Sequence, residues 1–492
     1  MKVTRPAYWL AVIVVSLFAA AASAAAKPPA EDRIQGSVVK IFTVASSPSY
    51  DQPWQMLPQQ MEIGSGSLIA PGRVLTNGHV IANATFVQVQ REGDPNKYQA
   101  RVLVAGHEAD LALLEVADPK FGQGVTPLQL GDSPAVRDKV QAYGFPVGGD
   151  RLSITEGVVS RIEMGQYAHC LKTLPLIQIS AAINPGNSGG PVIKDGKIVG
   201  VAFQGLDQAE NVGYMIPPVV IRHFLKDAED GKYDGFPTLG IDAEELENPS
   251  LRASLGLPAD RTGVLVARVA FQSSAWGQLQ TNDVIMSIGG QTVANDATIP
   301  YGRERILFSY ALVQLFPGDK LSLEVWRDRK AVTLSVPLKI GDSLVSTCDF
   351  DTAPSYYIFG GLLFSPLTLN YLQTWGGQWY AGSPVELRYH MINDLATPER
   401  TQVVVLQMVL ADEVNVGYHE YSDLVVTKVD GQPVKDLADL VQQIKSGTGE
   451  FVTIETEDGK FVVLARSAAN QANPRILQRY QINSDRSRDL KK

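Results

Sequence analysis

The chain has 492 residues, of which 45% are hydrophobic and 19% are charged, with a formal net charge of −9 at pH 7. A length of this order suggests about three domains of a globular protein. The acidic balance argues against nucleic-acid binding, which needs a basic face. Two cysteines, Cys170 and Cys348, are too few for a disulfide framework or a cysteine-based zinc site. Because the patterns below place them in separate domains, we expect two unpaired thiols.

The first 26 residues have the pattern of a secretory signal peptide. Lys2 and Arg5 precede an apolar run from Tyr8 to Phe18, which the small-residue stretch AAAASAAAK follows. The run is shorter than the ~20 residues of a membrane span. Cleavage after Ala24 or Ala26 is therefore favoured over an uncleaved anchor, which is the alternative. We expect an exported protein, periplasmic rather than secreted or anchored, without an integral membrane segment once the signal is removed.

Short β-rich runs follow, from Ile34 to about Ile221, separated by Gly, Pro, Asn and Asp. Many short strands with turn signals between them favour a sandwich or a barrel over a parallel α/β sheet. The segment IRHFLKDAEDGKY then predicts a helix that ends near Gly231. This part of the chain is therefore predicted to be a β domain closed by a helix.

Two copies of one β-rich module follow. In the first, Thr238 to about Leu338, RERILFSYALVQLF is apolar at helical spacing, and strand-like runs flank RDRK as a hairpin. In the second, DLVVTKVDGQPV resembles the NDVIMSIGGQTV of the first, LADLVQQIKS predicts an amphipathic helix, and Asp458-Gly459 marks a hairpin turn. The second copy also has an aromatic insertion, LNYLQTWGGQWYAGSPVEL. From Arg466 the chain has seven basic and two acidic residues, and we expect a solvated or partly disordered tail.

Three segments contain the residue types of nucleophilic catalysis. GSGSLIAPGRVLTNGHVIANA contains His79 after a strand-like run, ADLALLEV has Asp110 at its start, and INPGNSGGPV contains Ser188. A carboxylate that leads into an apolar strand needs a partner, because burying an unpaired charge is costly. The order His, Asp, Ser is that of the chymotrypsin-type triad, in which the serine attacks, the histidine takes its proton and the aspartate fixes the histidine tautomer. Taken singly, a structural histidine, a capping acid and a tight turn are the alternatives.

The residues around Ser188 predict the rest of an active site. Glycines let the backbone aim its N–H groups at one point, so Gly186, Asn187 and Ser188 are the predicted oxyanion hole. Ala182 and Ile183 occupy the positions that form the base of the specificity pocket in chymotrypsin-like folds. No acid lies between residues 177 and 193. A buried lysine or arginine would lack a counterion there, so we expect cleavage after Val, Ile, Ala or Leu.

The blocks GSGSLIAPGRVLTNGHVI, ADLALLEV and AINPGNSGGPV resemble the three motif blocks of the HtrA/Deg serine protease family. The two modules resemble its PDZ domains, the second being divergent, as in plant-type Deg proteases. The resemblance implies a mostly β protein with a chymotrypsin-like double β-barrel followed by two PDZ-like domains. The expected units are a signal peptide (1–26), a trypsin-like serine protease domain (27–232), PDZ domain 1 (237–340), a divergent PDZ-like domain 2 (341–466) and a basic tail (467–492).

The resemblance also implies a function. Proteases of this family degrade unfolded or damaged proteins without ATP and assemble into trimer-based homo-oligomers, and we expect no cofactor and no metal. PTLGI, with Leu239, Gly240 and Ile241, looks like the loop that receives a peptide carboxylate, with capture by edge-strand addition. FGGLLF, residues 359–364, is the best such loop of the second module, and SPSYDQPWQMLPQQME lies where these proteases have a regulatory loop. The alternatives are a chaperone or scaffold that binds unfolded chains with little or no proteolysis, and a PDZ adaptor with a degenerate protease domain.

Overall fold

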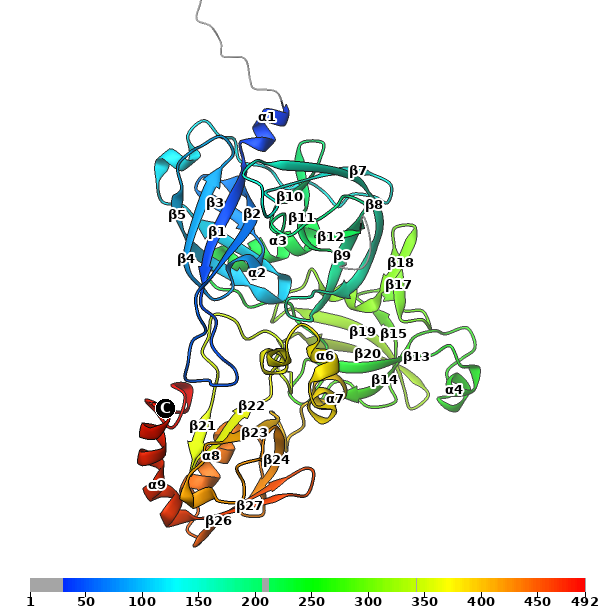
Figure 1. The fold of residues 1–492 in the computed structure, drawn as a ribbon. Helices are drawn as coiled ribbons and strands as arrows, with labels where there is room; N and C mark the ends of the chain where they lie inside the picture. Colours follow the sequence, from blue (N-terminus) through cyan, green and yellow to red (C-terminus); the bar gives the residue numbers. More distant parts are fainter. Residues whose placement is uncertain (1–29, 206–211, 342, 492) are drawn as a thin grey trace, which may run out of the picture.

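A computed structural model describes residues 30–205, 212–341 and 343–491, and the predicted signal peptide lies outside these ranges. The N-terminal unit is built from two closed six-stranded barrels (Figure 1). The first barrel has the strand order β1-β2-β3-β6-β5-β4 and the second β10-β11-β12-β9-β8-β7. The strands are β1 (Val38–Ala45), β2 (Gln60–Ala70), β3 (Arg73–Thr76), β4 (Ala84–Arg91), β5 (Tyr98–Gly106), β6 (Leu111–Glu115), β7 (Lys139–Gly144), β8 (Ser153–Gln166), β9 (Thr173–Ile179), β10 (Pro191–Lys194), β11 (Lys197–Gly205) and β12 (Gly213–Ile216).

Each barrel has its own apolar core. Val39, Ile41 and Leu114 are completely buried in the first, and Ile177 and Val192 in the second. Short helices connect the strands: α1 (Ala30–Gln35), α2 (Gly78–Ile81), η1 (His107–Ala109), η2 (Pro119–Gly122), α3 (Pro218–Asp227) and η3 (Ala228–Asp230). The helix expected after the barrels is confirmed as α3, and the mostly β fold with two barrels is confirmed as well.

The first module after the barrels is a sheet of order β13-β14-β15-β19-β20, with β16 paired to β15 and a separate hairpin β17-β18. Its elements are β13 (Ile241–Glu245), α4 (Pro249–Ser254), β14 (Val264–Val269), β15 (Val284–Ile288), β16 (Gln291–Thr292), β17 (Thr298–Tyr301), β18 (Glu304–Leu307), η4 (Phe308–Leu312), β19 (Lys320–Arg327) and β20 (Lys330–Pro337). The helix expected over RERILFSYALVQLF is wrong. The segment splits into β18 and the single turn η4, because Ile306 pairs with Ile299 of β17 and both are buried.

The second module has the sheet order β21-β22-β23-β24-β26-β27, with β25 paired to β24. Its strands are β21 (Tyr357–Phe359), β22 (Leu362–Pro366), β23 (Val404–Val409), β24 (Leu424–Val429), β25 (Gln432–Pro433), β26 (Phe451–Thr456) and β27 (Phe461–Ala465). The aromatic insertion folds into α5 (Leu369–Leu372), η5 (Gln373–Trp375), α6 (Trp379–Gly382) and the start of α7 (Val385–Asn393). The remaining helices are η6 (Glu413–Asn415), α8 (Leu437–Ser446), α9 (Arg466–Arg479) and η7 (Asp489–Lys491). The helix predicted for LADLVQQIKS is confirmed as α8.

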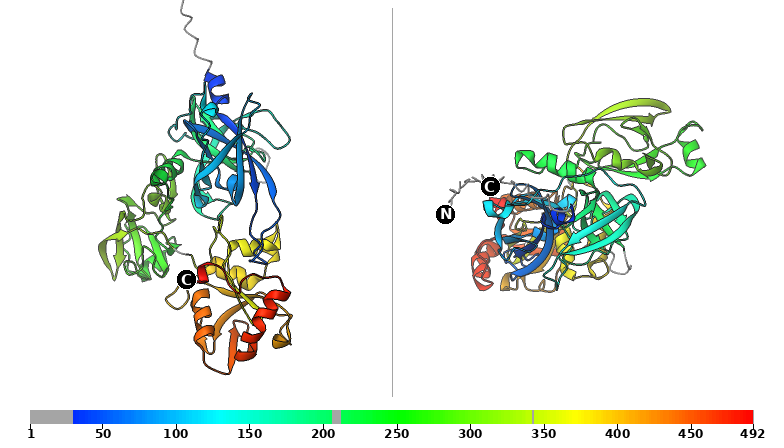
Figure 2. Two further views of the ribbon diagram at one scale, coloured as in Figure 1. Left: turned by 90° about the vertical axis from the view of Figure 1, so that its left-hand side faces the viewer. Right: turned by 90° about the horizontal axis from the view of Figure 1, so that it is seen from above.

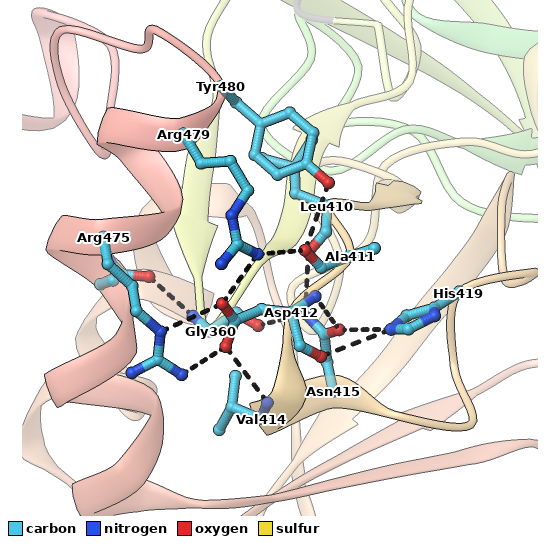
Figure 3. A network of polar contacts seen from close by, with 11 residues as sticks. Gly360, Leu410, Ala411, Asp412, Val414, Asn415, His419, Arg475, Arg479 and Tyr480 are labelled. Carbon is cyan, nitrogen blue, oxygen red and sulfur yellow. Dashed lines mark hydrogen bonds and ion pairs between the residues drawn. The ribbon is translucent and has the colours of Figure 1, made fainter.

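The expected solvated tail is corrected by the structure. Residues from Arg466 form helix α9, which buries Ala469, Ala472 and Ile476 against the second module. Its arginines have acidic partners: Arg475 and Arg479 both donate to Asp412, whose side chain is completely buried (Figure 3). The basic charge of the segment led us to expect a solvated tail. Asp412, which holds the helix in place, lies 63 residues before Arg475 in the chain, so the local sequence did not indicate it.

The three units are arranged with the barrels at one end, the second module at the other and the first module to one side (Figures 1 and 2). The segment between β1 and β2, where a regulatory loop was expected, extends to the second module. The Tyr50 hydroxyl donates to the Asp349 carbonyl at 2.9 Å, and the Trp54 ring meets that of Tyr356 edge-on with centroids 5.9 Å apart. Over the described ranges, no helix is both long enough and apolar enough to cross a membrane.

Candidate active site

The His79 and Asp110 side chains meet at the end of the first barrel. His79 lies in α2, directly after β3, and Asp110 lies between η1 and β6 with a φ of 50°. The His79 ring Nδ1 is 2.8 Å from Asp110 Oδ2 and 3.0 Å from Oδ1, and the His79 backbone N–H donates to Oδ1 at 2.8 Å. Asn77 donates to the Asp110 carbonyl at 2.7 Å. The carboxylate is thus held by both the ring and the backbone of the same histidine.

The burial of this pair sets its electrostatics. The Asp110 side chain is 2% exposed and that of His79 is 33% exposed. Burial alone would lower the pKa of His79, but the charge and hydrogen bond of Asp110 outweigh it, so the pKa of His79 is raised. Burial would raise the pKa of Asp110, but His79 lowers it below its usual value. The pair is therefore suited to a neutral imidazole that becomes an imidazolium beside a carboxylate.

The Ser188 loop, residues 185–190, packs against the strand that leads to His79. Gly186 and Gly189 have φ values of 96° and 84°, which favour glycine. A Cβ at Gly189 would lie 2.1 Å from the Ser65 carbonyl oxygen and 3.1 Å from the Asn77 nitrogen, so this close approach also requires glycine. The Ser188 hydroxyl donates to the Phe203 carbonyl at 3.3 Å. Within the described part of the chain the Ser188 hydroxyl makes no hydrogen bond to the His79 ring.

The predicted oxyanion hole is available at two of its three amides. The Asn187 N–H donates to the Asn184 carbonyl at 2.9 Å. The N–H groups of Gly186 and Ser188 donate to no acceptor in the parts of the chain that the structure describes. Of the three amides that the sequence assigned to a developing oxyanion, these two are therefore free within the described ranges, and that of Asn187 is not.

The two predicted pocket residues lie against strands of the second barrel, Ala182 against β8 and Ile183 against β12. The Ala182 carbonyl accepts a hydrogen bond from the Thr155 hydroxyl at 3.1 Å. Ile183 packs so closely on the wall of the second barrel that a Cβ at Gly213 would lie 2.4 Å from its Cγ1. The Ile183 side chain therefore fills space next to β12, as expected of a residue that limits the size of a pocket.

The loop with Leu239, Gly240 and Ile241 leads into β13, an edge strand that pairs only with β14 on its sheet. Gly240 has a φ of 69°, and a Cβ there would lie 2.3 Å from Ser273 Cβ. The N–H groups of Leu239 and Gly240 have no acceptor among the described residues. A cleft of about 370 Å³ lies along this loop and is also lined by Lys172 of the β8–β9 turn. A bound peptide could add as a strand to the free edge of β13, and its terminal carboxylate could accept hydrogen bonds from the two free amides.

The corresponding loop of the second module is filled by its own chain. The Gly360 N–H donates to the Asn473 side chain at 2.8 Å, and the Gly360 carbonyl accepts from Asn415 at 2.8 Å (Figure 3). Asn415 in turn accepts from the backbone N–H of Asp412 at 2.9 Å, which links the loop to the arginines of α9. Asn473 of α9 thus occupies the Gly360 N–H, a donor that a peptide carboxylate would need.

The two cysteines are joined, so the expectation of two unpaired thiols is wrong. Cys170, next to β9 in the second barrel, forms a disulfide with Cys348. Cys348 lies in the segment 343–356, which leads into β21 of the second module and is called the linker below. The linker crosses the surface of the barrels, and this brings together cysteines that are far apart in the sequence. Next to the bond, His107 and His169 lie beside His79, with the His169 and His79 ring centroids 6.1 Å apart. Sequence reasoning missed both histidines; for His107, only its position three residues before Asp110 could have indicated it.

Comparisons with known proteins identify the family. Residues 64–201 match the family model of a trypsin-like peptidase domain, and residues 237–338 and 345–489 match models of PDZ domains. The Arabidopsis thaliana protein named "Protease Do-like 4, mitochondrial" is 40% identical over 450 residues, which cover 91% of this chain and 84% of the relative. The chain belongs to the HtrA/Deg family of serine proteases.

Other relatives agree with this membership. "Protease Do-like 2, chloroplastic" of Arabidopsis thaliana is 40% identical over 459 residues, covering 92% of this chain and 75% of the relative. Among solved structures, an HtrA-type protease, AlgW, with a tripeptide has a TM-score of 0.50 at 26% identity, covering 63% of this chain and 95% of the other. The enzyme is thus a serine protease of the HtrA/Deg type with two PDZ domains. The two Arabidopsis thaliana relatives are named as mitochondrial and chloroplastic proteins.

Proposed function

We propose that the chain is an ATP-independent serine endopeptidase that hydrolyses unfolded or damaged proteins, with Ser188 as nucleophile, His79 as general base and Asp110 as the orienting carboxylate. The observation that supports it best is the His79–Asp110 pair, in which the carboxylate fixes the proton on Nδ1 and leaves Nε2 free to accept. Ser188 needs a rotation of its side chain away from the Phe203 carbonyl to reach Nε2.

The amides of Gly186 and Ser188 would hold the oxyanion of the tetrahedral intermediate. Each donor of this kind contributes about 3 kcal/mol in the transition state. Ala182 and Ile183 would limit the pocket to small and medium aliphatic side chains, because an arginine or lysine there would lose its hydration without gaining a counterion. We therefore expect cleavage after Val, Ile, Ala or Leu.

Substrate capture is assigned to the first PDZ domain, at Leu239, Gly240 and Ile241. The AlgW structure described above holds a tripeptide, and the free edge of β13 supports the same use here. We further propose a trimer-based assembly and an exported, periplasmic protein. The Cys170–Cys348 disulfide supports export, because disulfides persist in oxidising compartments.

Labelling with a fluorophosphonate probe tests this proposal. The oxidised wild type should be labelled and should digest an unfolded protein, and both activities should fall about 10⁴-fold in Ser188→Ala and in His79→Ala. The double variant should lose little more than either single one, because the residues act as a unit. Binding of unfolded protein without labelling or hydrolysis would instead favour the chaperone reading.

A further inference from the structure

The linker that leads into β21 lies against the helix that carries His79. Asp351 accepts a hydrogen bond from the Asn83 N–H at 2.6 Å, and its own N–H donates to the Asn83 side chain at 2.9 Å. Asn83 follows α2 by two residues and has a φ of 54°. Asp351 therefore holds the backbone that immediately follows the catalytic helix.

The same carboxylate also reaches the other end of α2. Asp351 Oδ2 is 2.8 Å from His107 Nε2, and His107 Nδ1 is 3.0 Å from His169 Nε2. A Cβ placed on Gly78, the first residue of α2, would lie 3.3 Å from His107 Nδ1. A consistent set of protons has His169 donating to His107 and His107 donating to Asp351. The carboxylate thereby fixes both tautomers. Asp351 directly contacts Asn83, two residues after α2, and it orients His107, which lies beside the first residue of α2.

Phe350 covers this histidine pair. Its ring stacks on His169 with centroids 4.0 Å apart and an interplanar angle of 22°, and lies 4.9 Å from His107. Burial lowers the pKa of His169 to about 4, with His107 and His79 lowering it further and with Asp110 and Asp351 opposing. His169 is then neutral at neutral pH, so it packs against His79 without repelling the imidazolium that forms during catalysis.

The disulfide fixes the linker close to this contact. Cys348 lies two residues before Phe350, and its partner Cys170 follows His169 directly. The bond therefore ties the two stacked residues, Phe350 and His169, through their own neighbours. The bond borders a cleft of about 670 Å³. Cys170 is buried and Cys348 is half-buried, so a reductant would reach the bond from the side of Cys348.

We propose that Phe350 and Asp351 are positioning residues of the His79–Asp110 pair and that the Cys170–Cys348 disulfide holds them in place, so that a dithiol reductant lowers turnover. In this step one thiolate of the dithiol attacks a sulfur of the bond and displaces the other cysteine, and its second thiol then resolves the mixed disulfide. The products are two cysteine thiols and the oxidised dithiol. The inference rests on the proposed roles of His79 and Asp110.

The test measures kcat and KM for a short chromogenic peptide ending in valine, with the full-length protein oxidised, reduced by dithiothreitol and reoxidised. Thiols are counted in each sample. We expect kcat to fall about tenfold on reduction and to recover on reoxidation, with KM little changed, because a displacement of about 1 Å at a catalytic group can cost up to 10²-fold. The Cys170→Ser/Cys348→Ser variant should have the low kcat and no response to dithiothreitol.

A matched pair of substitutions separates positioning from general loss of charge. In the wild type the Asp351 carboxylate accepts from His107 and from the Asn83 N–H. In Asp351→Asn the amide N–H would face one of these two donors, so kcat should fall about as much as on reduction of the disulfide. Asp349→Asn changes a nearby linker carboxylate that accepts from Ser346, and it should keep the wild-type kcat.

The inference would be overturned if the reduced protein, with two thiols titrated, kept the kcat of the oxidised protein. It would also be overturned if kcat fell equally in Asp351→Asn and Asp349→Asn. So would a parallel change of kcat and KM with a lowered melting temperature, which a merely structural role would produce. If the cysteine variant does not fold, reduction of the wild type and the asparagine pair still decide. Should His79→Ala retain full turnover, the proposed function fails; should it abolish turnover while reduction has no effect, only this inference fails.

Discussion

Replacing Asp110 with asparagine tests the proposed catalytic centre most directly. In the wild type the carboxylate accepts two hydrogen bonds from one residue, from the His79 backbone N–H and from the ring at Nδ1. An asparagine can accept only the first with its oxygen, and its amide then faces Nδ1 with a donor. The imidazole must respond by placing its proton on Nε2, where it can no longer accept the proton of Ser188.

The expected loss in kcat is about 10⁴-fold, which corresponds to about 5.5 kcal/mol of transition-state stabilisation. KM for a short peptide should change little, because Asp110 is buried and does not face the substrate. A second effect has a defined sign. Since Asp110 raises the pKa of His79, its removal lowers that pKa, and the acidic limb of kcat/KM should move to lower pH in the residual activity.

The assay is the pH dependence of kcat/KM, together with the rate of fluorophosphonate labelling. Asp94→Asn is a suitable control, because Asp94 is a carboxylate of the same barrel with hydrogen bonds from Arg91 and Tyr98 but lies outside the proposed site. It should retain wild-type kcat. A loss below tenfold in Asp110→Asn, or an acidic limb that stays in place, would refute the assignment of Asp110.

Three further predictions concern other parts of the molecule. Gly186→Ala should lower kcat by 10²-fold or more, because φ is 96° and the new Cβ would lie 2.4 Å from the Phe145 carbonyl; wild-type labelling rates would contradict this. Ile183→Ala should enlarge the pocket and raise cleavage after Met or Phe by about tenfold relative to Val, as mapped by mass spectrometry of a denatured substrate; an unchanged cleavage pattern would remove Ile183 from the pocket. Asp412→Asn should destabilise the second PDZ domain by roughly 1–3 kcal/mol with kcat for short peptides unchanged, and limited proteolysis that finds α9 equally protected would show that the Arg475 contact adds nothing.

Local patterns in the sequence were enough to predict the fold class and the family. The alternation of short apolar strands with turn residues predicts barrels, since each strand must bury one face and each turn needs residues of special conformation. Ser188 could be singled out because several glycines surround it, and glycines indicate a backbone with positive φ values that other residues rarely adopt. Asp110 could be matched to His79 because a carboxylate at the start of a buried strand requires a partner.

The tertiary structure alone decided the features that depend on distant segments. The linker lies against the barrels, and this contact creates both the Cys170–Cys348 disulfide and the cluster of His107, His169 and Asp351. The spacing of these residues in the sequence does not indicate that the linker lies there. Ile306 was assigned to a helix because its apolar neighbours fit that period, but pairing with Ile299 made it a strand. Helix α9 was expected to be solvated because its charge was visible and the acids that neutralise it were not. Propensity and periodicity describe a segment by itself, whereas these outcomes were set by which segments come into contact in the folded chain.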